Sequence, residues 1–114
     1  MFDVSSSKVA WALILVSGLL EVAFAAAIHA SNGFTRLVPA ALAVASGGLS
    51  VYLMSLTLAF IPIGTAYAVW GGIGAVGTAA LGLLMFGEPA APGRLLCIAL
   101  IVVGIVGLQL QEAA

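Results

Sequence analysis

The sequence predicts an all-α membrane protein with four transmembrane helices. Hydrophobic residues make up 64% of the 114 residues, charged residues make up 6%, and the mean hydropathy is +1.32. A soluble domain of this length would need far more polar surface. Four apolar segments alternate with short stretches of turn-forming residues. Because backbone groups in hydrocarbon must be paired within their own segment, the four segments are expected to be helices.

The helices are expected at 9–30, 37–60, 63–86 and 94–110, in one domain between an N-terminal extension (1–8) and a C-terminal tail (111–114). The turn sequence "SNG" follows the first segment, and Pro62 separates the second from the third. Two proline-containing turns precede the fourth segment, which is the shortest. Arg94 at its start is expected to reach the membrane interface and so extend that helix.

The first segment imitates a secretory signal peptide, because Lys8 precedes an apolar run that contains "AFAAA". That run is longer than a typical signal sequence, Glu21 interrupts it, and three more spans follow. The segment is therefore expected to stay in the protein as a transmembrane helix. The chain is expected to be a multi-pass protein of a bacterial-type inner membrane.

The ionisable and reactive residues exclude several classes of function. A net charge of −1 provides no basic patch, so nucleic acid is not an expected partner. The single Cys97 cannot form an internal disulfide or a cysteine-based metal site. His29 stands alone, and no nucleophile–base pair or metal-ligand cluster is evident. We therefore expect no enzyme activity, no metal site and no cofactor.

Glu21 is the one charged residue in the middle of an apolar segment. A charged acid at the bilayer centre costs about 2.5–3.5 kcal/mol on insertion scales. Ser17 and Gly18 share its helical face, so small side chains surround the carboxyl group. Such a group can carry a proton, and once deprotonated it attracts a cation. The alternative is a permanently protonated glutamate with a structural role.

The second and third segments provide groups that suit a buried carboxylate. Hydroxyl groups on the second can donate to it or bond back to their own helix. Aromatic residues on the third can donate a hydrogen bond and place a π face against an organic cation, unless they form an interfacial belt. These residues are Ser46, Ser50 and Thr57 in the second segment, and Tyr67, Trp70, Gly71 and Gly74 in the third.

Glycine-rich stretches mark the last two segments. The run "GGIGAVGTAALG" at 71–82 favours close helix packing and a kink in the third helix. The fourth segment carries Gly104 and Gly107 but no ionisable group in its interior. It is therefore expected to serve packing or dimerisation.

The basic residues that flank the segments give almost no bias for one orientation of the chain in the membrane. Lys8 lies on the side of the termini, whereas Arg36 and Arg94 lie on the other. This balance is compatible with a weak preference for one orientation. It is equally compatible with a chain that inserts both ways and pairs with its own inverted copy. Four short helices hardly enclose a polar pathway alone, which also favours a dimer.

Five stretches together resemble the small multidrug resistance transporters: "GLLEV", "NGFTRLVP", "IPIGTAYAVWGGIGAVG", "FGEP" and "LIVVGIVGL". The resemblance extends from about Trp11 to Leu110. The third-segment string is most similar to the guanidinium-exporter branch of that family.

This resemblance implies an antiparallel, dual-topology homodimer that exports small organic cations in exchange for protons. It implies that Glu21 binds either protons or cationic substrate, and that the lipid bilayer surrounds the dimer. By position, the binding-site surroundings would be Gly18, Phe24, Ser50, Tyr67, Trp70 and Gly71. A hinge in the third helix would lie at Gly72 and Gly74, and alternating access would bend it.

Three positions depart from the guanidinium-exporter pattern. Phe24 replaces a tryptophan, Gly71 replaces a serine or threonine, and His29 replaces a lysine. Fewer fixed donors predict a looser polar site. Guanidinium or substituted guanidinium ions are the expected substrates, and export of quaternary ammonium compounds, alone or as half of a heterodimer, is the alternative.

Two other classes of membrane protein share some of these features. A rotary proteolipid also has a mid-membrane carboxylate, but on a later helix and in a large ring. An accessory subunit without transport activity would need no titrating acid.

Overall fold

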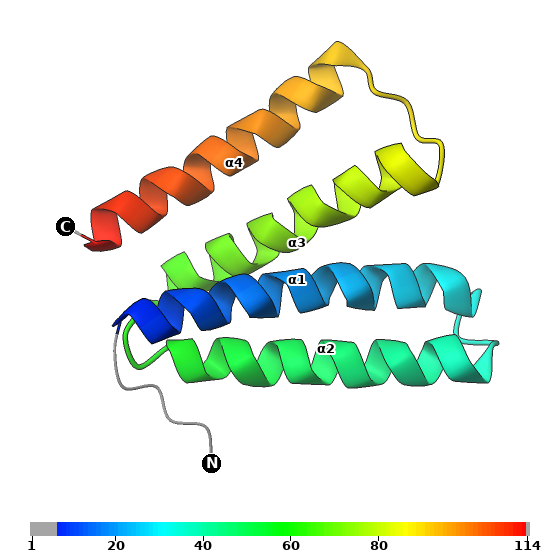
Figure 1. The fold of residues 1–114 in the computed structure, drawn as a ribbon, viewed down its shortest axis with the longest axis horizontal. Coiled ribbons are helices and arrows are strands. Elements are labelled where there is room, and N and C mark those ends of the chain that lie inside the picture. The colour runs from blue at the N-terminus through cyan, green and yellow to red at the C-terminus, as the bar shows by residue number, and fades with distance from the viewer. Residues whose placement is uncertain (1–6, 114) are drawn as a thin grey trace.

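Four helices make up the fold, and a computed structural model describes them over residues 7–113, with side chains to 111 (Figure 1). They are α1 (Ser7–Ser31), α2 (Leu37–Thr57), α3 (Ile63–Met85) and α4 (Pro92–Ala113). All four are long and apolar enough to cross a membrane, and the described part of the chain contains no strand. The predicted class, an all-α protein with four transmembrane helices, is confirmed.

The helix ends differ from the expected ones for local reasons. Helix α1 begins at Ser7, so it includes the last two residues of the extension expected at 1–8, and residues 1–6 lie outside the described residues. Helix α2 ends at Thr57, whose carbonyl accepts from the N–H groups of both Phe60 and Ile61 in the turn that follows. Pro62 then disfavours a helical conformation at Ile61. Helix α4 begins at Pro92, where a missing N–H leaves no hydrogen bond unmade, and it continues to Ala113.

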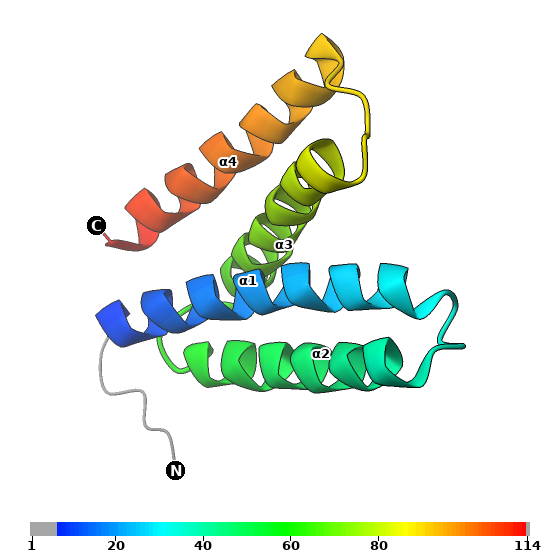
Figure 2. The same cartoon turned by 45° about the vertical axis from the view of Figure 1, so that its right-hand side comes forward.

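The helices form a flat, open arrangement. Helix α1 packs against both α2 and α3, whereas α4 packs chiefly against α3 (Figures 1 and 2). The described chain measures 41 × 39 × 18 Å, and its smallest dimension equals about two helix diameters. The small core lies where α1, α3 and the turn before α3 meet, and consists of Ala10, Ile14, Ile61, Ala66 and Val69.

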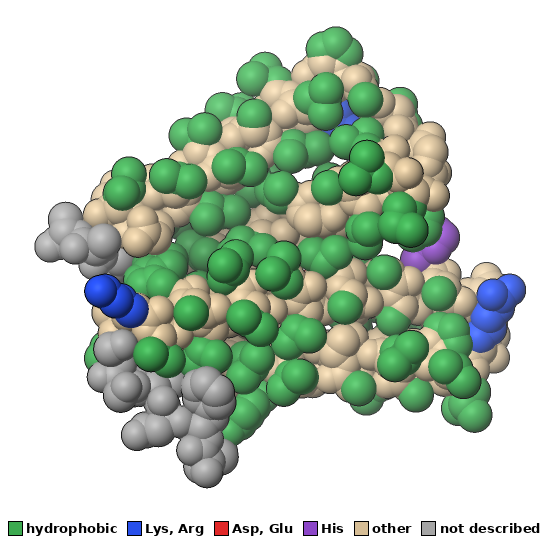
Figure 3. All heavy atoms as spheres, viewed as in Figure 1, with side chains coloured by type: hydrophobic (Ala, Val, Ile, Leu, Met, Phe, Trp, Pro, Cys, Tyr) green, Lys and Arg blue, Asp and Glu red, His purple; other side chains and the backbone are tan. Residues whose placement is uncertain are grey.

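Most of the apolar surface points outward. Figure 3 shows hydrophobic side chains along all four helices, with basic side chains near helix ends. The share of the membrane-crossing window that is buried is 22% in α1 and 0% in α4. Lipid tails are as apolar as these side chains, so hydrophobicity does not drive the helices together and exposed apolar residues are compatible with a bilayer.

Glycines allow α1 and α3 to approach closely. A Cβ atom added at Gly18 would lie 2.6 Å from the Cβ atom of Ile73. A Cβ atom at Gly77 would overlap the side chain of Val22. Small residues at such crossings replace the missing hydrophobic driving force with close van der Waals contact.

Two local contacts fix the ends of the helices. The His29 ring at the end of α1 stacks on Phe86 after α3, with ring centroids 4.4 Å apart. In the α1–α2 turn the backbone N–H of Phe34 donates to the Ser31 hydroxyl at 3.0 Å. The turn passes through Gly33 with a φ of +72°, a conformation that glycine adopts without a steric penalty.

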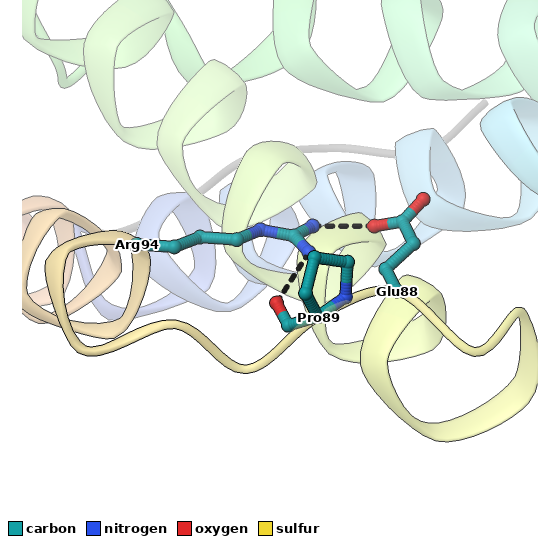
Figure 4. Close-up of polar contacts among 3 residues, drawn as sticks. All are labelled: Glu88, Pro89 and Arg94. Carbon is teal, nitrogen blue, oxygen red and sulfur yellow. Dashed lines mark hydrogen bonds and ion pairs between the residues drawn. The ribbon is translucent and has the colours of Figure 1, made fainter.

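An ion pair closes the α3–α4 connection (Figure 4). The Arg94 guanidinium pairs with the Glu88 carboxylate and donates to the Pro89 carbonyl at 3.1 Å. The Glu88 side chain occupies the space that a side chain at Gly82 would need. Sequence reasoning expected Arg94 at the membrane interface but did not identify Glu88 as its partner in this loop.

We expect Gly77→Ala to destabilise the protein. The added methyl group overlaps Val22, a β-branched residue with little rotamer freedom, and overpacking of this kind costs about 1–3 kcal/mol. Gly64→Ala is the matched control, because a Cβ atom at Gly64 meets nothing within 4 Å. Thermal unfolding in detergent measures the stability of both variants. Adding Val22→Ala to the Gly77→Ala variant should restore its stability, because it removes the side chain that the new methyl group overlaps. A Gly77→Ala protein as stable as wild type would contradict the observed α1–α3 packing.

Candidate functional site

Glu21 lines a groove of about 470 Å³ between α1 and α2. The groove is predominantly apolar, and Glu21 is the only ionisable residue among those lining it. Its other lining residues are Phe24 on α1, Ala43, Val44, Gly47, Gly48 and Val51 on α2, and Trp70 on α3. A concave apolar site with one carboxyl group suits an organic cation, because the walls contact its carbon skeleton and the carboxylate balances its charge.

The stem of Glu21 packs on α3. A Cβ atom added at Gly74 would lie 3.0 Å from the Cβ atom of Glu21. This close approach fixes the base of the side chain, whereas its carboxylate has no hydrogen-bond or ion-pair partner among the described residues. The carboxylate is therefore available to a proton or a ligand that enters the groove.

Phe24 forms one wall of the groove and Gly47 lies beneath it. A Cβ atom at Gly47 would lie 2.8 Å from Cδ1 of Phe24, so the ring lies directly against the α2 backbone. Next to it, Gly48 has nothing within 4 Å of its Cβ position. Together with Ala43, these glycines make a shallow floor that leaves room for a ligand.

Three hydrogen bonds connect α1, α2 and α3 beside the groove. The Ser17 hydroxyl donates to the Ser50 carbonyl at 2.6 Å, and the Ser50 hydroxyl donates to the Ser17 carbonyl at 2.7 Å. The indole N–H of Trp70 donates to the Ser50 hydroxyl at 2.8 Å. Both serines are fully buried, whereas Trp70 is partly exposed and reaches the groove.

Of the residues expected around Glu21, the structure brings Phe24 and Trp70 into the groove and attaches Ser50 to Trp70. Tyr67 contacts Trp70, with ring centroids 5.5 Å apart, but its side chain is 63% exposed and does not line the groove. Gly71 is exposed next to open space. Gly18 is buried against Ile73, on the packed side of α1.

Helix α3 is continuous through the expected hinge. A Cβ atom at Gly72 would lie 2.8 Å from Ile105 on α4, whereas the Cβ position of Gly74 faces Glu21 on α1. These two glycines therefore permit close contacts with different neighbours. Gly104 and Gly107 on α4 have nothing within 4 Å of their Cβ positions in this chain.

Sequence reasoning missed the floor of the groove and the role of Ser17. The string "SGGLS" at 46–50 was a usable signal for the floor, because Ala43 and Gly47 are one helical turn apart. The pairing of Ser17 with Ser50 depends on the relative register of α1 and α2, which no local pattern contains. The described residues contain no group of three or more histidine, cysteine or acidic side chains placed to hold a metal ion.

Comparisons with known proteins agree with this architecture. Residues 9–101 match the family described as "Small Multidrug Resistance protein". A guanidinium exporter of Citrobacter freundii is 48% identical over 101 residues, which cover 89% of this chain and 96% of the relative. A guanidinium exporter of Yersinia pseudotuberculosis is 46% identical over 103 residues, which cover 90% of this chain and 99% of the relative.

Proposed function

Since this chain belongs to the small multidrug resistance family, we propose that it exports guanidinium or small substituted guanidinium ions in exchange for protons. Its relatives are named as exporters, so it is a transporter and not an enzyme. Its four apolar helices place it in the bacterial inner membrane as a multi-pass protein. The observation that carries the proposal is the unpaired Glu21 carboxylate in an apolar groove.

Protons and substrate compete for Glu21. A guanidinium ion presents a planar fork of N–H donors, which binds a carboxylate through two parallel hydrogen bonds. The aromatic rings of Phe24 and Trp70 border the same groove and provide π faces for the cation. A protonated carboxyl group has lost the charge that attracts the cation, so binding of one ligand releases the other.

We assign the second half of the site to another copy of the chain, inserted in the opposite orientation. The flat shape and the unburied α4 support this assignment, because one chain leaves the outer surface of α4 free for a second copy to cover. Gly104 and Gly107 have space beside them in this chain and can provide close packing between α4 helices. The near balance of basic residues at the two ends allows both orientations.

Alternating access then moves the groove from one side of the membrane to the other. We assign the bend to Gly72 and Gly74, because both lie in α3 and contact neighbours on opposite sides of it. A helix bends most easily where side chains are absent and backbone hydrogen bonds are readily strained.

A broader specificity, including quaternary ammonium ions, is the second candidate. Gly48 lines the groove and has nothing within 4 Å of its Cβ position, so apolar substituents find room on that side of the groove. The same features fit one half of a heterodimeric exporter, in which the partner chain completes the site.

The first test removes the charge of Glu21. Glu21→Gln retains the shape of the side chain but cannot ionise, so we expect it to abolish guanidinium-driven proton currents in proteoliposomes. Glu88→Gln is the matched control, because Glu88 lies outside the groove and a partly exposed ion pair contributes about 0–1 kcal/mol. Glu21→Asp should retain transport with a shifted pH dependence. Undiminished exchange by Glu21→Gln would refute the mechanism.

The second test concerns orientation. Reporters fused to the C-terminus should be found on both faces of the membrane in comparable amounts. Two lysines added near the N-terminus should bias insertion to one side and reduce transport when that variant is expressed alone. A wild-type chain found in one orientation only would instead support a heterodimer or a parallel assembly.

The third test defines the substrate with a panel of guanidinium, phenylguanidinium and tetrapropylammonium, measured as currents on a solid-supported membrane. We expect currents from both guanidinium compounds. Phe24→Trp restores an indole donor and should favour guanidinium over the ammonium ion. Gly48→Leu fills the floor of the groove and should reduce phenylguanidinium current more than guanidinium current. Currents from the ammonium ion alone would reject guanidinium as the substrate class.

A further inference from the structure

We propose that Ser17 is a positioning residue that holds the indole of Trp70 in the substrate groove. Its hydroxyl fixes the α2 backbone at Ser50, and its carbonyl orients the Ser50 hydroxyl that accepts from the indole. The proposal deepens the proposed function, because its consequence for transport depends on Trp70 bordering a cation site. Its structural content depends only on the three hydrogen bonds that connect α1, α2 and α3.

The directions of these bonds can be worked out from the groups involved. The indole N–H is a donor only, so the Ser50 hydroxyl must accept from Trp70. The single proton of that hydroxyl then goes to the Ser17 carbonyl, at 2.7 Å. The Ser17 hydroxyl lies 3.4 Å from the Ser50 hydroxyl and uses its own proton at 2.6 Å on the Ser50 carbonyl. Each serine therefore holds the backbone of the other helix.

The pair also reaches the backbone of Glu21. In a regular α-helix the carbonyl of residue i accepts the N–H of residue i+4, so the Ser17 carbonyl accepts from Glu21 as well as from the Ser50 hydroxyl. A continuous chain of hydrogen bonds thus extends from the Trp70 indole through Ser50 and Ser17 to the helical turn that carries Glu21. It connects one wall of the groove to its only ionisable residue.

Burial keeps the Ser17 and Ser50 hydroxyls on their inter-helix partners. Ser17 and Ser50 are both 0% exposed, so neither hydroxyl can exchange its protein partner for solvent within this chain. The other α2 serines differ, because Ser46 and Ser55 donate to carbonyls of their own helix, Leu42 at 2.7 Å and Tyr52 at 2.6 Å. Only Ser50, among these three, connects separate helices.

Committing the Ser50 proton to Ser17 has a chemical consequence. While the Ser50 hydroxyl donates to the Ser17 carbonyl, it cannot donate to the Glu21 carboxylate. In this conformation the carboxylate has no partner within the described chain and remains available to a proton or a substrate. Ser17 thereby orients Trp70 and also keeps Ser50 from occupying the Glu21 site.

The test observes Trp70 directly. The chain contains two tryptophans, so the 15N-indole spectrum of the purified protein in detergent has resonances from Trp11 and Trp70 only, with up to two for each where the two chains of a dimer are inequivalent, and Trp11→Phe assigns them. We expect Ser17→Ala to shift the Trp70 indole resonance and to leave that of Trp11 unchanged. Ser55→Ala, which removes a hydroxyl from an exposed position on α2, is the control and should move neither resonance.

Transport adds a second measurement. Ser17→Ala should raise the apparent KM for guanidinium about 2- to 10-fold, which is the factor that corresponds to one buried hydrogen bond. The maximal current should change less. Because Ser17 and Ser50 act as one unit, the Ser17→Ala/Ser50→Ala double variant should raise the apparent KM for guanidinium no more than Ser50→Ala alone does. Ser17→Thr retains the hydroxyl and should keep the wild-type Trp70 resonance.

If Ser17→Ala does not fold, the Trp70 resonance is measured in Ser17→Cys instead. A thiol is close in volume to the serine hydroxyl but is a weak hydrogen-bond donor. An unshifted Trp70 resonance in a folded variant would overturn the proposal, as would fully additive effects of Ser17 and Ser50. A wild-type protein without guanidinium currents would reject the proposed substrate, but the indole comparison would still decide whether Ser17 positions Trp70.

Discussion

The structure depends on a carboxyl group placed inside a membrane-spanning helix. A charged acid in this position costs about 2.5–3.5 kcal/mol unless a proton or a cation compensates it. Glu21 has neither an ion pair nor a hydrogen-bond partner in the described chain, and its groove is otherwise apolar. We therefore assign the compensation to a proton or a cationic substrate. Aromatic side chains and small α2 residues line the groove beside the carboxylate, and the buried Ser17–Ser50 pair lies behind Trp70.

Glycine has two different structural roles in this chain. In the α1–α3 contact, Gly18 and Gly77 allow the helix backbones to approach, which supplies packing energy where the hydrophobic effect supplies none between lipid and protein. Beside Glu21, Gly47 gives room to the Phe24 ring and Gly48 leaves the groove open. The same residue type therefore holds the scaffold together on one side of α1 and creates space on the other.

The fold could be predicted from the sequence because bilayer thickness and backbone pairing leave few alternatives for long apolar segments. The helix ends were less predictable, since α2 ends in a turn at Thr57 and α4 begins at Pro92, where Arg94 pairs with Glu88 of the preceding loop. Glu21 stood out at once as an isolated charge, and Trp70 as an aromatic residue inside a span. The Ser17–Ser50 pair and the contact of Phe24 with Gly47 could not be found in this way, because both depend on how α1 and α2 are aligned.

The central claim is that Glu21 exchanges its proton for the substrate, and proton release on binding tests it most directly. Guanidinium is added to the purified protein in weakly buffered detergent at a series of pH values, and a pH indicator records the protons released. The account predicts release in proportion to the guanidinium bound by wild type, and neither binding nor release by Glu21→Gln. Guanidinium binding without proton release, or equal release from the Glu21→Gln variant, would contradict it.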